Sequence, residues 1–110
     1  MLTAEEGFRR LSIGDPVLLA QLAGPDADAG LRRLDERIEA LIRVAVLIPI
    51  DAPQSSFQAA VEAAMRAGAT IDDLLAVLIA VAGSVGSPRV VSAAPRIALA
   101  AGYDAEAALE

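Results

Sequence analysis

The order of apolar and polar positions along the chain predicts a succession of helices. Apolar side chains recur every three or four residues, and residues typical of helix starts precede most of these segments. Thr3 lies three residues before Glu6, and Asp15 directly precedes Pro16; both patterns are typical of the start of a short helix. Gly24 is expected to end the second of these helices.

Longer helices are predicted after a turn-rich linker over residues 23–30. Asp35 is expected to begin a helix that runs to about Ile48, where Pro49 stops it. A fourth helix is predicted over residues 53–67, because a glycine follows it as a C-terminal cap.

Two further helices complete the predicted chain. Thr70 and Asp73 form a capping-box pattern, and the fifth helix that follows has no polar side chain until Ser84. Residues 84–88 are expected to form a turn. The sixth helix is predicted from Ser87-Pro88 to Gly102, with Pro95 kinking or splitting it, and a last turn is expected over residues 104–109.

A length of 110 residues suits one domain with its own core. We therefore predict a single all-α domain over residues 1–110, built as a compact bundle of about six helices. Residues 1–33 would hold the short helices and the linker, and residues 34–102 the core. The β-branched runs favour strands only weakly, because each continues a capped segment of helical length.

Charge and hydropathy exclude several classes of partner. A net charge of −6 argues against nucleic acid and against an anionic membrane surface. The longest apolar runs, residues 44–50 and 74–83, are shorter than the roughly 20 residues that a membrane span needs. The first residues are acidic where an export signal needs a basic and then an apolar run, so we expect a cytoplasmic protein.

Composition also limits the chemistry, because the chain has no Cys, His or Lys. Thiol chemistry is excluded, and we expect no metal site, since imidazole and thiolate ligands are missing. The remaining general acids or bases are carboxylates and the phenol of Tyr103.

Three sets of polar residues leave alternatives open. Glu39 and Arg43 have two possible roles. Either they form an ion pair on the surface, or Glu39 is a buried carboxylate that faces the start of the fourth helix and is paired with Arg43. Ser56 either satisfies a backbone group in the first turn or is catalytic. Arg89 and Arg96, seven residues apart on one helix face, are either solvated or an anion clamp.

Helical periodicity divides the fourth predicted helix into faces. One face is polar and is expected to contain an ion pair between Glu62 and Arg66. A strip of small residues along the edge of its apolar face suits close approach of another helix: Ser56, Ala60, Ala63 and Ala67.

The third helix beyond Arg43 and the fifth beyond Asp73 are apolar on all sides, which is typical of fully buried helices. A chain of this size cannot surround both helices by itself, so the sequence predicts a homo-oligomer.

Three segments resemble the carboxymuconolactone decarboxylase family, which includes alkylhydroperoxidase D-like proteins: "LDERIEALIRVAVLI", "AGATIDD" and "VGSPRVVSAA". The resemblance covers about residues 34–102. It implies an all-α, alkylhydroperoxidase D-like unit that assembles into homotrimers or homohexamers.

The family's peroxidase members use a Cys-x-x-Cys pair, a nearby His and an upstream Glu as a proton relay. By this resemblance the two thiols fall at Pro53 and Ser56 and the His at Ala60, while Glu39 matches the upstream Glu. Thiol peroxidase activity is therefore not expected, because Ser cannot cycle through a disulfide.

The family's decarboxylase members need neither a cofactor nor a Cys. The resemblance thus implies a cofactor-independent lyase for a small organic acid or lactone, with Glu39 and Ser56 catalytic and with Arg43, Ser55 and Gln58 binding the substrate. The alternative is a member without catalysis that serves as an oligomeric scaffold or binds a small molecule.

Overall fold

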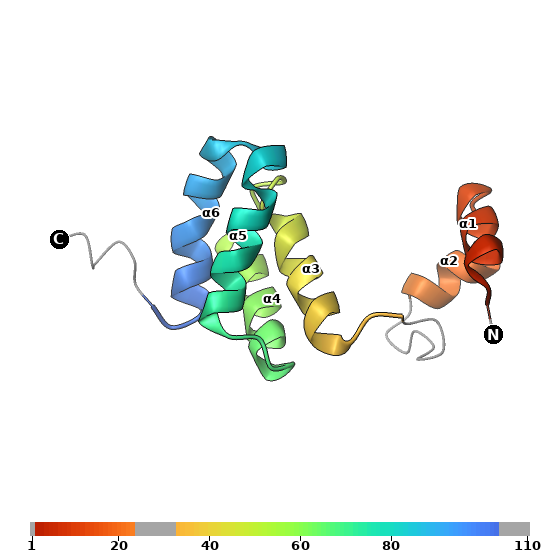
Figure 1. Cartoon of the computed structure of the whole chain (residues 1–110), viewed down its shortest axis with the longest axis horizontal. Coiled ribbons are helices and arrows are strands. Elements are labelled where there is room, and N and C mark those ends of the chain that lie inside the picture. Colours follow the sequence, from red (N-terminus) through yellow and green to blue (C-terminus); the bar gives the residue numbers. More distant parts are fainter. Residues whose placement is uncertain (1, 24–32, 104–110) are drawn as a thin grey trace. The chain divides into compact units, whose positions relative to one another are not determined.

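The computed structural model describes residues 2–23 and 33–103, and these residues form six helices and no strand (Figure 1). The prediction of an all-α fold of about six helices is confirmed. The helices are α1 (Ala4–Ser12), α2 (Pro16–Ala23), α3 (Glu36–Leu47), α4 (Gln54–Arg66), α5 (Ile71–Val85) and α6 (Ser87–Ala100).

The chain divides into two compact units, residues 1–35 and residues 36–110. The predicted division after residue 33 lies within two residues of this boundary. The first unit holds α1 and α2, and the second holds the bundle of α3 to α6. That both units belong to one domain stays a prediction.

Both short helices of the first unit begin as their sequences predict. The Thr3 hydroxyl accepts a hydrogen bond from the Glu6 backbone N–H, and the Asp15 carboxylate accepts from Val17 and Leu18. Leu18 is the only buried apolar side chain among the described residues of this unit. So few residues cannot enclose a sizeable core.

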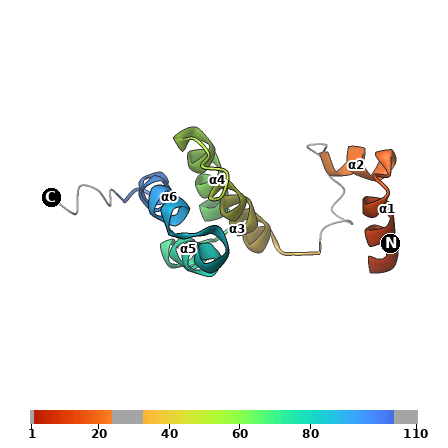
Figure 2. The same cartoon turned by 90° about the horizontal axis from the view of Figure 1, so that it is seen from above.

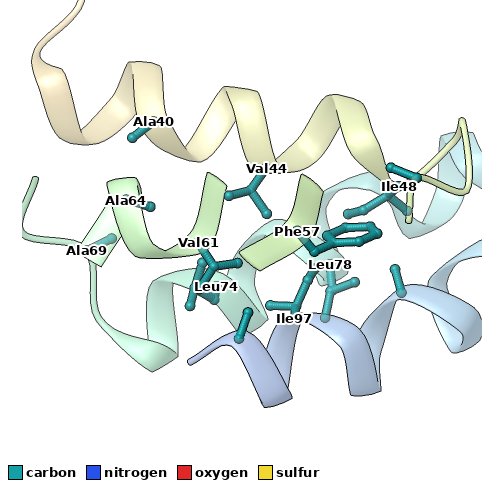
Figure 3. Packing of buried hydrophobic residues seen from close by; sticks show 13 residues of the cluster. Ala40, Val44, Ile48, Phe57, Val61, Ala64, Ala69, Leu74, Leu78 and Ile97 are labelled. Atoms are coloured by element: carbon teal, nitrogen blue, oxygen red, sulfur yellow. The ribbon is translucent and has the colours of Figure 1, made fainter. Parts of the chain in front are cut away.

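The bundle of the second unit is a ring in which α3 packs on α4 and α5, and α6 packs on the same two helices. From above, α3 lies beside α4 and α5 beside α6 (Figure 2). Ala40 of α3 lies near Ala64 late in α4, and Ile48 after α3 lies near Phe57 early in α4, so the two helices run antiparallel (Figure 3). The fully buried centre is apolar: Val44, Ile48, Phe57, Val61 and Leu74.

The start of α5 is confirmed in detail. The Thr70 hydroxyl accepts from the Asp73 N–H at 3.1 Å, and the Asp73 carboxylate accepts from the Thr70 N–H at 2.9 Å. The predicted turn over residues 84–88 is wrong in extent, because α5 continues to Val85 and α6 begins at Ser87. Gly86 alone makes the turn, at a φ of 95° that favours glycine.

Pro95 does not split α6, which runs unbroken from Ser87 to Ala100. Ala93 and Ile97, two residues before and after Pro95, are buried. Their packing keeps the helix continuous past Pro95, which has no backbone N–H to donate. The predicted end at Gly102 is two residues too late.

Several predictions fall outside the described residues: the cap at Gly24, the linker over residues 23–30 apart from Ala23, and the last turn over residues 104–109. Within the described ranges, no helix is long and apolar enough to cross a membrane.

We expect the free energy of unfolding of the bundle to fall in acid because the Asp73 carboxylate becomes protonated. The Thr70 backbone N–H lowers the pKa of this carboxyl below its ordinary value, and Arg37, 3.6 Å away, acts in the same direction. A depressed folded-state pKa means that the stabilisation is complete above the unfolded pKa, about 3.9, and is lost as the pH falls through the folded value.

We expect Asp73→Asn to lose less stability than the wild type between pH 7 and pH 3, because the amide still accepts from Thr70 but does not titrate. Urea unfolding at both pH values measures this difference. An equal loss in the two proteins would contradict the assignment.

Candidate functional site

Glu39 and Arg43 form an ion pair along α3, with Glu39 Oε2 3.6 Å from Arg43 Nη2. The Glu39 side chain is 17% exposed and the Arg43 side chain 62% exposed. The carboxylate is largely covered, and its cationic partner reaches into solvent. The expectation that Glu39 faces the start of the fourth helix is wrong, because the neighbouring Ala40 lies near Ala64, late in α4 (Figure 3).

The other three candidate residues lie in the first turns of α4. Ser55 is exposed, and Ser56 and Gln58 are half-buried. The Gln58 amide donates to Glu62 at 2.7 Å. The predicted Glu62–Arg66 ion pair is therefore replaced by this bond among the described residues.

The structure does not bring Glu39 and Ser56 together. Glu39 directly precedes Ala40, which lies near the end of α4, whereas Ser56 directly precedes Phe57, which lies near the end of α3 (Figure 3). Ala40 and Ile48, which mark these two levels, are eight residues apart, or roughly 12 Å at about 1.5 Å per residue. Glu39 thus lies at one end of the antiparallel pair and the serines at the other.

The outer surface between α3 and α5 is apolar, and we call it the α3–α5 face. It contains a shallow groove of about 170 Å³, lined by Ile38, Leu41, Ile42, Ala45, Val77, Ala80 and Val81. Ile42 is 47% exposed, and Val46, about one turn further along α3, is 54% exposed. The prediction concerned α3 beyond Arg43 and α5 beyond Asp73; in the single chain the apolar surface left in solvent also includes Ile38 and Ile42, which precede Arg43.

A second apolar depression, the α5–α6 hollow, has a volume of about 280 Å³. Its floor is made by core residues: Leu74, Leu78 and Ile97. Its α6 side is made by small residues: Ala94, Ala98 and Ala101. Ile71, Asp72, Leu75 and Tyr103 complete the lining. Neither depression is lined by any of the five candidate residues.

Sequence reasoning missed a polar cluster around Asp51, which lies in the connection between α3 and α4. Arg89 Nη1 and Arg96 Nη1 lie 3.4 and 3.6 Å from its carboxylate oxygens, and the Ser92 hydroxyl donates to it at 3.1 Å. Arg96 also donates to the Ala52 carbonyl at 2.6 Å. The two arginines are thus neither simply solvated nor an empty anion clamp, because they hold a carboxylate of their own chain.

Part of this cluster can be predicted from the spacing of its residues in the sequence. Arg89, Ser92 and Arg96 are spaced three and four residues apart, so they share one face of α6. Asp51 has a φ of 50°, a left-handed conformation that Asp tolerates better than most residues, but its place against α6 depends on the fold.

The described residues contain no group of three or more carboxylates placed to hold a metal ion. Comparison of the chain with protein-family models, with curated proteins and with solved structures finds no match. The family resemblance of residues 34–102 therefore stays a prediction that rests on the three quoted segments.

Proposed function

We propose that this protein is a non-catalytic oligomeric scaffold whose copies associate through the α3–α5 face. The observation that carries the proposal is the exposure of Ile38, Ile42 and Val46 on α3, beside a stretch of α5 with no polar side chain between Asp73 and Ser84. Soluble monomers rarely expose contiguous apolar surface of this kind. A second copy, which presents the same face, is the occupant with matching chemistry.

The energetics support the same partner. Covering a half-exposed Ile or Val side chain gains about 1 kcal/mol, half of the value for full burial. Each added subunit covers such side chains on both surfaces, and the summed gain acts against a cost of association of about 4–15 kcal/mol. The family resemblance points to a trimer or a hexamer.

Light scattering on the purified protein tests the proposal. We expect a mass three or six times the 11.3 kDa of one chain at micromolar concentration. A mass equal to one chain would overturn it.

The lyase hypothesis needs Glu39 and Ser56 to act on one substrate, and the roughly 12 Å between their levels in the antiparallel pair of α3 and α4 weighs against this. We expect Glu39→Gln to leave the oligomeric mass unchanged. We further expect it to remove the ion pair with Arg43, which as an i,i+4 pair contributes about 0.2–0.5 kcal/mol to the unfolding free energy. Loss of turnover of any organic acid in this variant would favour the lyase instead.

We also expect no turnover of an organic hydroperoxide with any thiol reductant, because the chain has no Cys from which a thiolate could form. A coupled assay on metal-free protein measures this. Turnover above the uncatalysed rate would contradict the prediction.

A further inference from the structure

The α5–α6 hollow is built for a ligand with an apolar body. Its floor belongs to the packed core, where Leu74 is 1% and Leu78 7% exposed, so its shape is fixed by the fold. The α6 side presents alanines at 94, 98 and 101, and this spacing leaves room beside the large side chains of α5.

The volume of the hollow sets the size of that ligand. A dry apolar cavity of about 150 Å³ in another protein takes up benzene. At the same filling, the roughly 280 Å³ here takes an apolar body of about ten non-hydrogen atoms. Ile71 and Leu75, which are 49% and 56% exposed, would lose contact with water when such a body is bound.

The charge of the residues that line the hollow determines which polar head group a ligand can carry. Asp72 is the only charged residue of the lining, and Tyr103 the only other residue with a polar side chain. Among the described residues the Asp72 carboxylate has no hydrogen-bond or ion-pair partner, whereas Asp73 beside it is held by Thr70 and Arg37. No cationic side chain lines the hollow, so a carboxylate ligand would meet the like charge of Asp72 without a cationic side chain to pair with.

We propose that the α5–α6 hollow binds a small apolar primary amine, with its hydrocarbon body on the Leu74–Leu78–Ile97 floor and its ammonium group at Asp72. The ammonium is charged at neutral pH and donates to the carboxylate. The Tyr103 phenol, which also lines the hollow, offers a further acceptor. No residue lines both this hollow and the groove of the α3–α5 face, so the two proposals rest on different residues.

Three probes with the same eight-carbon chain test the proposal on the full-length protein: octylamine, octan-1-ol and octanoate. Ligand-observed NMR titration measures their dissociation constants. We expect octylamine to bind about two to five times more tightly than octan-1-ol, the range of a solvent-exposed ion pair, and octanoate to bind most weakly. Equal affinities, or no binding of octylamine, would overturn the proposal.

Two variants locate the head group. Asp72→Asn should remove the preference for octylamine over octan-1-ol while leaving the affinity for octan-1-ol unchanged. Glu62→Gln on α4 makes the same change in net charge away from the hollow, so it should keep the preference. If both variants reduce the preference equally, the amine responds to the net charge of −6 and the site assignment is wrong.

A third variant locates the body. Ala98→Leu fills the hollow from α6 and should weaken octylamine and octan-1-ol alike by at least about tenfold, because the added side chain takes the volume of the ligand. Should Ala98→Leu lose its helical circular dichroism, Ala94→Leu replaces it. Unchanged affinity in a folded variant of either kind would overturn the location.

Light scattering on the same samples separates this proposal from the scaffold. Octylamine should bind whether the protein is an oligomer or a single chain. A monomeric protein that binds octylamine would refute only the proposal of an oligomeric scaffold. An oligomer that does not bind octylamine would refute only the proposal of an amine site in the α5–α6 hollow.

Discussion

Replacing Ile42 by Asp is expected to lower the light-scattering mass of the protein to the 11.3 kDa of a single chain. Ile42 lines the groove of the α3–α5 face and is 47% exposed, so in the proposed oligomer its side chain is covered by a neighbouring copy. An Asp at this position would bury an unpaired carboxylate in the contact, which costs several kcal/mol for every contact formed. Micromolar association does not survive a loss of that size.

Leu99→Asp is the matched control for this variant. Leu99 lies on α6, which does not contribute to the α3–α5 face, and it is 52% exposed. Both variants add one negative charge at a half-exposed apolar position, so a general effect of charge would act on both. We expect Leu99→Asp to keep the oligomeric mass and both variants to keep their helical circular dichroism. Dissociation of both would show a general effect of charge, and an unchanged mass for Ile42→Asp would show that the contact lies elsewhere.

The helix starts could be predicted to within a residue because their signals are local. The Thr70–Asp73 box and the Asp15 cap each depend on side chains within three residues of the backbone groups that they satisfy. The end of α5 was harder to place, because Ser84 is compatible with either a turn or a helix. Its packing against α6 carries the helix on to Val85.

Long-range pairings explain what the sequence could not predict about the candidate site. Asp51 meets Arg89 and Arg96, which lie about 40 residues further along the chain, only because the ring of helices places the start of α6 beside the α3–α4 connection. The same topology separates Glu39 from Ser56. From the sequence order alone, both residues lie on two consecutive helices, and their distance cannot be predicted. A pattern along one helix predicts a face, and the partner of that face depends on the fold.

The sequence also could not predict what covers the exposed apolar residues. The pattern of α3 and α5 predicted buried helices, and Val44 and Leu74 are indeed buried. Periodicity does not tell whether the remaining faces are covered by the same chain or by another copy. The exposure of Ile42 makes that question an experimental one.

Phe57→Ala is expected to cost about 3–5 kcal/mol of unfolding free energy, the range for a buried Phe. Phe57 is 1% exposed, is the largest fully buried side chain, and lies near Ile48 at the centre of the ring (Figure 3). A bundle of about 70 residues has a total stability of about 3–10 kcal/mol, so this loss would unfold a bundle at the lower end of the range and remove about a third to a half of the stability at the upper end.

The control for this loss is Met65→Ala, which removes another large apolar side chain from the same helix. Met65 is 40% exposed, so its truncation leaves no enclosed cavity and should cost less than about 1 kcal/mol. Urea unfolding followed by circular dichroism, at protein concentrations low enough to dissociate the oligomer, compares the two variants. Similar midpoints for Phe57→Ala and Met65→Ala would mean that the ring of α3 to α6 does not pack around Phe57, and the fold itself would have to be revised.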